Sequence, residues 1–452
     1  MSCALGVTTS KVFSPQHLLQ VLSRLPNTSR YWVAYSGGLD SHVLLHAVAA
    51  LRIHLPTVAV HAAHVHHGLQ AQAEQWAKHC EHVCQSLHVP FHLLRINAHA
   101  APGESPEAAA RDARYTALGG LIELGDCLLT AHHQDDQAET LLIQLLRGAG
   151  PQGLASMPVQ TGFAKGLHAR PLLEFTRDEL HAYGEQHELH WIDDHSNLNT
   201  DFDRNYLRHD ILPRLRERWP AAARTLSRSA SHAAEAAHLL EALAHTDLHY
   251  VRGPQADMLS ISKLLTLDTA RQKNVLRYWI KSLGLPLPST THVEHILSDA
   301  ITANWDSTPC VRWPGAELRR YRDLIYAMTP LPAHEATQQI VWDMTEVLRL
   351  PNNLGNLSAL AVTGAGLKAS LCRSKSATIR FRQGGERCQP VGRDGSHELK
   401  NLLQEQGIPP WLRDRIPLIY LDNSLAAVAD RWVCQPFQAH ADEPGVQISL
   451  LL

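Results

Sequence analysis

The sequence lacks the cysteine pairs that bind iron–sulfur clusters or carry persulfides. Its 8 cysteines include no CxxC motif and no dense spacing of the kind found in disulfide frameworks. No basic segment followed by an apolar core opens the sequence, and no run of about 18 apolar residues occurs in it. We therefore expect a reduced, cytoplasmic protein with no membrane partner.

An excess of either charge is also missing. The 41 lysine and arginine residues nearly balance the 44 aspartate and glutamate residues, and the formal net charge is −3. Bulk charge therefore predicts neither nucleic-acid nor membrane binding, and a polyanion would have to be met by local basic patches. The 30 histidines are unusual, because their full protonation would move the formal charge to +27 and make binding to a polyanion sensitive to pH.

The sequence also lacks the Walker motif GxxxxGK[ST]. A different glycine turn occurs between an expected strand and an expected helix, where a phosphate site would lie. Residues 31–51 read as an apolar strand, a turn and a helix. The two glycines let the backbone bring N–H groups close to an anion, the serines add hydroxyl donors, and the helix directs its positive end at the same place. The turn that we predict to bind phosphate is SGGLDS, formed by Ser36, Gly37, Gly38, Leu39, Asp40 and Ser41.

Strand-like and helix-like segments alternate over the first half of the chain. Strands are expected at residues 31–35, 57–65, 90–96 and 126–131, helices at 71–87 and 105–124, and a last short strand at 190–193. This order predicts an α/β fold with a doubly wound parallel sheet. Ligands of such sheets bind at the carboxyl ends of the strands, which is where the SGGLDS turn would lie.

A second polar stretch, AHHQDDQAET, follows the fourth expected strand. If a helix begins near Gln134, then Asp135 and Asp136 lie four and three residues before Glu139, so that the carboxylates can share one face. Together with Asp40 these acids would make a Mg²⁺ site. Because Mg²⁺ commonly takes only one or two protein carboxylates with phosphate oxygens and water, not all four acids need to bind.

Several motifs, in order, resemble those of the tRNA(Ile)-lysidine synthetase family, whose catalytic domain is of the N-type ATP pyrophosphatase (PP-loop) class. They are SGGLDS, HVHHGL at 64–69, EAAARDARY at 107–115, HQDDQAET at 133–140, LLRGAGPQGL at 145–154, RPLL at 170–173, and DDHSN with DRNYLR between 193 and 208. RFRQGGERCQPVGR at 380–393 and IPPWLRDRIPLIY at 408–420 resemble the family's C-terminal tRNA-binding domain. Gln70 departs from the arginine that many members place after HGL.

The resemblance implies a ligase that joins L-lysine to C2 of the wobble cytidine of an isoleucine tRNA with a CAU anticodon, so that the tRNA reads AUA as isoleucine. ATP first adenylates the base with release of pyrophosphate, and the lysine ε-amine then displaces AMP. On this resemblance the SGGLDS turn binds ATP, while Asp40, Asp135, Asp136 and Glu139 bind Mg²⁺. Asp40, Asp136 and His133 would act in catalysis, and either a nearby carboxylate or His133 would accept the proton of the lysine amine.

Local basic patches are the expected contacts with tRNA. Residues 204–228 carry seven arginines against two acids, and residues 373–415 carry nine basic residues against five acids. The residues that we expect to bind tRNA are Arg111, Arg114 and Arg147 near the catalytic turn, Arg204 and Arg208 in DRNYLR, and Arg380, Arg382, Arg387, Lys400, Arg413 and Arg415 in the last domain.

The chain divides into four expected parts. These are a PP-loop catalytic domain over residues 1–215, a mainly helical tRNA-docking domain over 216–330, a linker with short strands over 331–368 and a small α+β tRNA-binding domain over 369–452. The sequence leaves open whether the protein forms a homodimer.

Three other functions stay open on the residues alone. A tRNA cytidine thiolating enzyme would share the turn but would need the cysteine pairs that are missing here. A glutamine-dependent synthetase would need an amidase half, and neither Cys3 nor a GxSxG motif supplies one. A tRNA-binding protein that has lost activity would have no need of the intact acids Asp40, Asp135 and Asp136.

Overall fold

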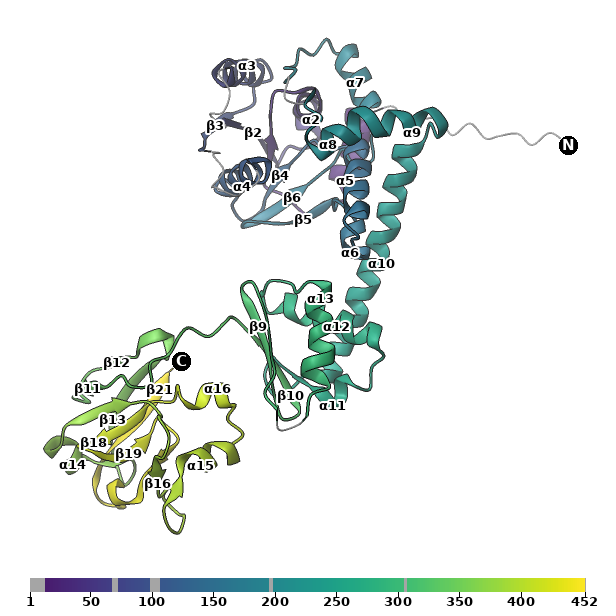
Figure 1. Cartoon of the computed structure of the whole chain (residues 1–452). Helices are drawn as coiled ribbons and strands as arrows, with labels where there is room; N and C mark the ends of the chain where they lie inside the picture. Colours follow the sequence, from purple (N-terminus) through teal and green to yellow (C-terminus); the bar gives the residue numbers. More distant parts are fainter. Residues whose placement is uncertain (1–12, 67–71, 98–105, 195–197, 305–306, 452) are drawn as a thin grey trace. The chain divides into compact units, whose positions relative to one another are not determined.

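The computed structural model describes residues 13–66, 72–97, 106–194, 198–304 and 307–451. Its contacts divide the chain into two compact units, Met1–Leu243 and Ala244–Leu452. The division falls within one long helix, α10 (Ala222–Val251) (Figure 1). None of the helices formed by the described residues combines the length and the apolar character that a bilayer crossing requires.

The first unit is built on a six-stranded sheet in the order β3 (Phe91–Arg95), β2 (Ala59–His66), β1 (Arg30–Ala34), β4 (Asp126–Leu129), β6 (Gly166–Ala169) and β5 (Gln160–Phe163). The first five of these strands are parallel, and β5 pairs antiparallel with β6. The expected parallel sheet is therefore confirmed. Since the strand order runs outward from β1 in both directions, the carboxyl end of β1 lies at a topological switch point, where ligands of such sheets bind.

Helices pack on both faces of this sheet, because side chains alternate along its central strand. Tyr31 and Val33 share one core with α1 (Pro15–Leu22), α2 (Leu39–Ala50), α3 (Ala73–Ser86) and α7 (Arg177–Gln186). Trp32 belongs to a second core with Leu118 of α4 (Pro106–Gly119) and Ile122. This confirms the doubly wound arrangement.

Two segments of the first unit differ from the sequence-based expectation. Residues 190–193 form no strand, and the Ile192 N–H instead donates to Gly37 O at 2.9 Å. The β5–β6 hairpin was not expected, because its strands are short and contain the glycines Gly162 and Gly166, which strands disfavour. Three parts of the predicted motifs lie outside the described residues: 67–69 of HVHHGL together with Gln70, 195–197 of DDHSN, and Cys3.

Further helices follow the sheet strands. They are η1 (Leu51–His54), α5 (Gln134–Leu146), α6 (Pro151–Leu154), α8 (Asp203–Tyr206), η3 (Leu207–Ile211) and α9 (Leu212–Arg218). The start of α5 at Gln134 and the capping box of Thr176 with Glu179 at the start of α7 agree with the sequence signals.

The second unit begins with helices around a four-stranded antiparallel sheet. The helices after α10 are α11 (Ile261–Leu264), α12 (Thr269–Ser282), α13 (Thr290–His295) and η4 (Ile296–Ile301). The sheet has the order β7 (Met258–Ser260), β10 (Leu324–Met328), β9 (Ala316–Tyr321) and β8 (Cys310–Trp313). Trp279 of α12 is fully buried in the core between the helices and the sheet. This part of the chain is helical, as expected, and the four-stranded sheet completes it.

The rest of the second unit consists of two larger sheets with short helices. One has the order β11 (Ile340–Trp342), β15 (Ala377–Arg380), β18 (Leu418–Leu421), β19 (Ser424–Val428) and β20 (Trp432–Val433). The other has the order β12 (Leu348–Arg349), β13 (Asn356–Thr363), β21 (Pro444–Leu451) and β14 (Leu367–Lys368). A small pair is formed by β16 (Arg387–Cys388) and β17 (His397–Glu398), and the helices are η5 (Pro351–Asn353), α14 (Ala369–Ser374), α15 (Leu399–Glu405), α16 (Pro410–Arg413) and η6 (Gln435–Phe437).

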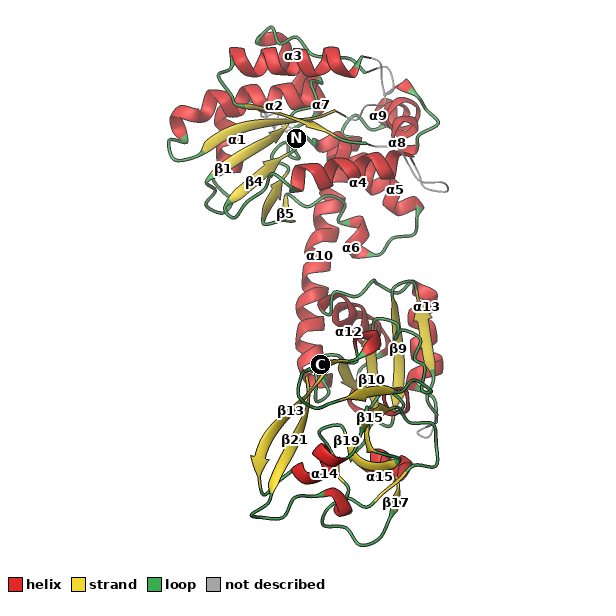
Figure 2. Ribbon diagram, turned by 90° about the vertical axis from the view of Figure 1, so that its left-hand side faces the viewer, coloured by secondary structure: helices red, strands yellow, loops and turns green. Residues whose placement is uncertain are grey.

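The expected linker over residues 331–368 does carry short strands, but they belong to the C-terminal sheets. β11 pairs with β15, and β13 pairs with β21 over eight residues at the end of the chain (Figure 2). Each of these pairings joins segments far apart in sequence. The segment is therefore an integral part of the C-terminal fold rather than a spacer before it.

Several histidines of the first unit are buried as neutral rings. Burial lowers the pKa of His42 to about 4 and that of His168 to about 3. Thr130 Oγ1 lies 2.8 Å from His168 Nε2 and 2.9 Å from His132 Nδ1, and burial lowers the pKa of His132 to about 3. Protonation of these rings therefore favours the unfolded chain, in which histidine titrates near ~6.5.

We predict that mild acid destabilises the first unit. Because the folded pKa of each buried histidine lies below its unfolded pKa, the stabilisation is complete above about pH 6.5 and is lost as the pH falls toward the folded values. The free energy of unfolding in urea should decrease between pH 7 and pH 5 by about 1–2 kcal/mol for each such histidine. His42→Gln should reduce this loss, whereas His54→Gln, at an exposed position, should not. An identical loss in the wild type and His42→Gln would contradict the prediction.

Candidate active site

The SGGLDS turn joins β1 to α2 and is held by its two serines. The hydroxyl oxygens of Ser36 and Ser41 lie 2.9 Å apart, and the Ser36 N–H donates to Ser41 Oγ at 3.2 Å. Ser41 Oγ donates to Gly38 O at 3.0 Å, and the Gly38 N–H donates to Ser36 Oγ at 3.3 Å. The N-terminus of α2 is thereby fixed at the carboxyl end of β1, where its N–H groups can bind an anion.

Gly37 is the turn residue whose conformation requires glycine. Its φ is +90°, and a Cβ at this position would lie 2.8 Å from Ile192 Cδ1 and 3.0 Å from Cys80 Sγ. Gly38, the N-cap of α2, has a φ of −76°, and a Cβ there would come no closer than 3.6 Å to Ser36 Oγ. Gly37 is therefore needed for the turn itself, whereas a methyl group at Gly38 would make only ordinary van der Waals contacts.

Asp40, in the first turn of α2, lies beside the start of α5. Its Oδ2 is 3.6 Å from His133 Nε2, while its Oδ1 is buried and has no hydrogen-bond partner among the described residues. His133 is the N-cap of α5, and its Nδ1 accepts the Asp136 N–H at 3.4 Å while Asp136 Oδ2 accepts the His133 N–H at 3.0 Å. This reciprocal cap brings the imidazole next to Asp40.

Two arginines neutralise two acids of α5. Asp136 Oδ1 lies 3.0 Å from Arg204 Nη2 and 2.8 Å from Arg208 Nη2. Glu139 is fully buried, and its oxygens lie 2.8 Å from Arg204 Nε and 2.7 Å from Arg208 Nε. We call these four residues the carboxylate–arginine cluster, and it joins α5 to the α8–η3 segment.

The cluster sets the protonation of its neighbours. Burial opposes ionisation of Asp136, but His133 and Arg204 outweigh burial and hold the pKa of Asp136 far below its usual range. Burial also opposes a positive charge on His133, yet Asp136 and Asp40 outweigh it and raise the pKa of His133. Asp136 is therefore ionised, and His133 is a stronger base than a free imidazole.

Three of the four acids expected to bind a metal ion contact arginines in this structure. The oxygens of Asp136 and Glu139 are taken by the cluster, and Asp135 accepts the Arg177 N–H at 2.8 Å and pairs with Arg216. Within the described ranges, no three His, Cys, Asp or Glu side chains are grouped so that they could hold a metal ion.

Asp40 is the acid that fits a metal ion. Its buried, unpartnered Oδ1 is the kind of oxygen that a divalent cation takes as a ligand, and phosphate oxygens and water can complete the shell of Mg²⁺. Arg204 and Arg208, in turn, are directed at carboxylates, and their contact with tRNA phosphates stays a prediction.

Three family models match consecutive parts of the chain. They are a PP-loop domain at residues 11–215, a TilS substrate binding domain at 259–326 and a TilS substrate C-terminal domain at 377–450. The tRNA(Ile)-lysidine synthase of Coxiella burnetii is 45% identical over 439 residues, which are 97% of each chain. That of Methylococcus capsulatus is 43% identical over 93% of this chain and 96% of its own. The chain belongs to the tRNA(Ile)-lysidine synthase family.

Similarity to solved structures is weaker than these sequence matches. The U34-tRNA thiolase NcsA from Methanococcus maripaludis, with its [4Fe-4S] cluster, aligns with a TM-score of 0.42 and 16% identity over 48% of this chain and 76% of its own. A TilS C-terminal domain aligns with a TM-score of 0.20 and 20% identity over 25% of this chain and 99% of its own. Values this low carry no functional argument, so membership in the tRNA(Ile)-lysidine synthase family rests on the sequence relatives and the family models.

In this member of the tRNA(Ile)-lysidine synthase family, basic and aromatic side chains gather on α4. The guanidinium carbons of Arg111 and Arg114 lie 5.1 and 5.7 Å from the centre of the Tyr115 ring. The Tyr115 ring is in turn 5.6 Å from the ring of His168. Arg147, at the end of α5, is exposed. These positions keep Arg111, Arg114 and Arg147 as candidates for tRNA contact.

The arginines predicted in the C-terminal domain fall into two groups. Arg387 and Lys400 are exposed, and Arg380 and Arg382 reach the polar side chains Asn423 and Asp414 at the surface, at 2.9 and 2.7 Å. Arg413 is buried, where it donates to Ile408 O at 2.8 Å and to Tyr321 Oη at 3.0 Å, and half-buried Arg415 donates to Pro332 O. The guanidinium of Arg413 therefore supports the fold, and tRNA binding by Arg413 stays a prediction.

Two contributors to the site were missed at the sequence level. Ile192 was assigned to a strand, although it packs against Gly37, and Arg216 was counted only among basic residues, although it pairs with Asp135. The regular spacing Arg204, Arg208, Arg216 was the available signal, because residues four or eight apart can lie on one helical face.

We predict that the two glycines of the turn differ in their tolerance of a methyl group. Gly37→Ala should lower the stability by about 1–3 kcal/mol, because it combines a positive φ with a clash against Ile192. Gly38→Ala should leave the melting temperature near the wild-type value. Thermal unfolding of both purified variants checks this, and equal melting temperatures would contradict it.

We also predict that the cluster depends on both arginines. Arg208→Ala should destabilise the protein by about 2–4 kcal/mol, since it leaves Glu139 buried with one partner fewer. Arg214→Ala removes an exposed arginine from the same region and should change stability by less than about 0.5 kcal/mol. Urea denaturation of the matched pair measures the difference, and a neutral Arg208→Ala would show that the acids find other partners.

Proposed function

We propose that this protein ligates L-lysine to C2 of the wobble cytidine of an isoleucine tRNA with a CAU anticodon, using ATP and releasing AMP and pyrophosphate. The observation that carries the proposal is the SGGLDS turn, whose Asp40 lies beside His133, in a chain that aligns over 97% of its length with a tRNA(Ile)-lysidine synthase. Lysidine at this position makes the tRNA read AUA as isoleucine.

The first step is attack of the cytosine C2 oxygen on the α-phosphate of ATP. The turn supports it because the N–H groups at the N-terminus of α2 can receive the leaving pyrophosphate. Asp40 would hold Mg²⁺ through its unpartnered Oδ1. When bound, the ion would neutralise the charge that develops on the phosphates.

The second step requires a neutral lysine amine, although free lysine titrates near ~10.4. Asp135, Asp136 and Glu139 are poor proton acceptors, because each is paired with arginine. His133 is the remaining group near Asp40, and neighbouring carboxylates raise its pKa. Either His133 or a nearby carboxylate would accept the amine proton in this proposal.

The target base must also leave its stack, at a cost of about a few kcal/mol. The ring of Tyr115 with Arg111 and Arg114 above it offers an aromatic surface flanked by positive charge, which suits the unstacked bases of an anticodon loop. Arg147, which is exposed at the end of α5, is a further candidate in the first unit.

The function is tested by incubating the protein with ATP, Mg²⁺, L-lysine and an isoleucine tRNA transcript that carries a CAU anticodon. A lysine-sized mass gain on cytidine, found in the digested nucleosides together with pyrophosphate, is the expected result. Pyrophosphate without the mass gain would overturn lysine as the nucleophile. Neither product from folded protein that still binds tRNA would favour a binding module.

We predict that Asp40→Asn abolishes turnover without unfolding the protein. The substitution keeps the size of the side chain but removes the charge that would attract Mg²⁺, so pyrophosphate release should fall by at least about 100-fold. Asp178→Asn, which changes an exposed acid in α7, is the matched control and should keep full activity. Unchanged turnover in Asp40→Asn would remove Asp40 from the proposed metal site.

The C-terminal arginines are expected to separate into binding and folding roles. Arg387→Ala should weaken tRNA binding and leave ATP binding unchanged. A plot of log affinity against log salt concentration should become less steep, by the equivalent of about one phosphate contact. Arg413→Ala should instead lower the melting temperature, because it leaves Tyr321 Oη and Ile408 O without their donor. Filter binding at several salt concentrations and thermal unfolding distinguish the two, and a parallel loss of tRNA and ATP binding in Arg387→Ala would indicate misfolding.

A further inference from the structure

Two cysteines of the C-terminal domain lie in contact although they are 46 residues apart in sequence. Cys388 ends β16, Cys434 directly follows β20, and their Sγ atoms are 2.7 Å apart. Each residue is only 2% exposed. The pair shares a small core with Leu402, next to Trp432 and Phe437. Neither sulfur takes part in the chemistry proposed above.

The backbone holds the two segments together independently of the sulfur atoms. Cys434 and Pro390 form an antiparallel bridge. The Gln435 N–H donates to Gln389 O at 2.8 Å, and the Val391 N–H donates to Val433 O at 3.3 Å. A bond between the two sulfurs would therefore join segments that are already neighbours, with little rearrangement of the chain.

The two thiols differ in acidity. The hydrogen bond from Cys434 lowers the pKa of Cys388, whereas the same contact raises the pKa of Cys434. Burial raises the pKa of Cys80 and Cys127 to about 12. Because the thiolate is the reactive form, whichever thiol of the contacting pair loses its proton attacks first, and the other is its neighbouring partner.

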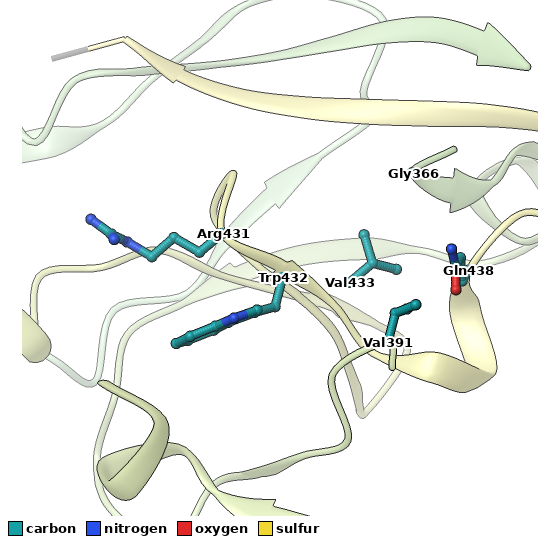
Figure 3. A pocket seen from close by; sticks show the side chains of 6 residues that line it. All are labelled: Gly366, Val391, Arg431, Trp432, Val433 and Gln438. Carbon is teal, nitrogen blue, oxygen red and sulfur yellow. The ribbon is translucent and has the colours of Figure 1, made fainter. Parts of the chain in front are cut away.

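A pocket of about 240 Å³ borders the same two segments. Val391 and Val433 line it from the bridged segments, and its other lining residues are Gly366, Arg431, Trp432 and Gln438 (Figure 3). Hydrogen peroxide is close in size to water, which occupies about 30 Å³ in the liquid. The pocket is therefore large enough for several molecules of this size. The pocket thus gives a small oxidant a place next to the residues that flank the pair.

We propose that Cys388 and Cys434 form a redox site that closes to an intramolecular disulfide with a hydroperoxide as oxidant. The thiolate of one cysteine attacks hydrogen peroxide, the O–O bond breaks, and a sulfenic acid and hydroxide result; the hydroxide takes the proton that this thiol released. The sulfur of the other cysteine then attacks the sulfenic sulfur, the S–S bond forms, and the hydroxyl leaves as water with the proton of the second thiol. The two sulfurs together lose two electrons, and the peroxide becomes two waters. A dithiol reductant restores both thiols by exchange.

The bond ties the β16–β17 hairpin to the end of β20. Arg387 begins this hairpin, directly precedes Cys388 and is one of the candidate tRNA contacts. Closing a loop of this length also restricts the unfolded chain, and this stabilises the folded form. The redox site does not depend on the proposed ligase activity, because neither ATP nor tRNA enters its chemistry.

The experiment counts free thiols in the full-length protein. Reduced protein, denatured and treated with N-ethylmaleimide, should take 8 adducts. Protein exposed to a small excess of hydrogen peroxide and then quenched should take two fewer, its digest should contain the Cys388 and Cys434 peptides joined, and dithiothreitol should restore all adducts. The melting temperature of the oxidised form should be higher by roughly 5–10 °C and should return on reduction.

Single variants provide the controls. Cys388→Ala and Cys434→Ala should each abolish the paired loss of two adducts, whereas Cys310→Ser, which changes an exposed cysteine, should retain it. The proposal is overturned if oxidised wild type keeps all its adducts, if the joined peptides contain other cysteines, or if Cys388→Ala still loses two adducts. The peptide map of the wild type decides the matter even where a variant does not fold.

Discussion

The carboxylate–arginine cluster is the constraint on which the catalytic edge of the first unit depends. Glu139 has no exposed surface, and an unpaired carboxylate in such a place would cost several kcal/mol. Arg204 and Arg208 pair with Glu139 through their Nε atoms and with Asp136 Oδ1 through their Nη2 atoms. Every charged group of the cluster therefore has more than one partner. Since Arg204 lies 65 residues after Glu139, this pairing fixes the α8–η3 segment against α5.

The same edge is reinforced by short contacts from separate parts of the chain. His133 caps the N-terminus of α5, and the hydroxyls of Ser36 and Ser41 hold the turn before α2. The Ile192 N–H, from a third segment, donates to Gly37 O. Each contact satisfies a polar group at the end of an element, where the backbone has no partner of its own. Helix N-termini and acids are thus brought to the switch point of the sheet by local bonds whose partners are distant in sequence.

The parts of this architecture that the sequence predicted are those encoded locally. The β1 strand, the turn and α2 follow from an apolar run rich in aromatic and β-branched residues, two glycines and helical spacing. The pairing of β13 with β21 could not be read in this way, because the partner strand lies at the far end of the chain and short strands carry weak periodicity. The arginines show the same limit: composition marks Arg204, Arg387 and Arg413 alike as basic, and only the fold directs one to carboxylates, one to the surface and one to a buried tyrosine.

The distribution of charge around the turn explains why one acid differs from the others. Asp135, Asp136 and Glu139 are each compensated by a guanidinium, whereas Asp40 Oδ1 has no partner among the described residues. A carboxylate in a phosphate-binding turn repels the phosphates of ATP, and in a poorly hydrated site this repulsion would amount to several kcal/mol. A cation held by Asp40 would supply the positive charge that offsets this repulsion. The arginines therefore do more than stabilise buried acids: by compensating three of the four carboxylates, they leave the uncompensated negative charge beside the phosphate-binding turn.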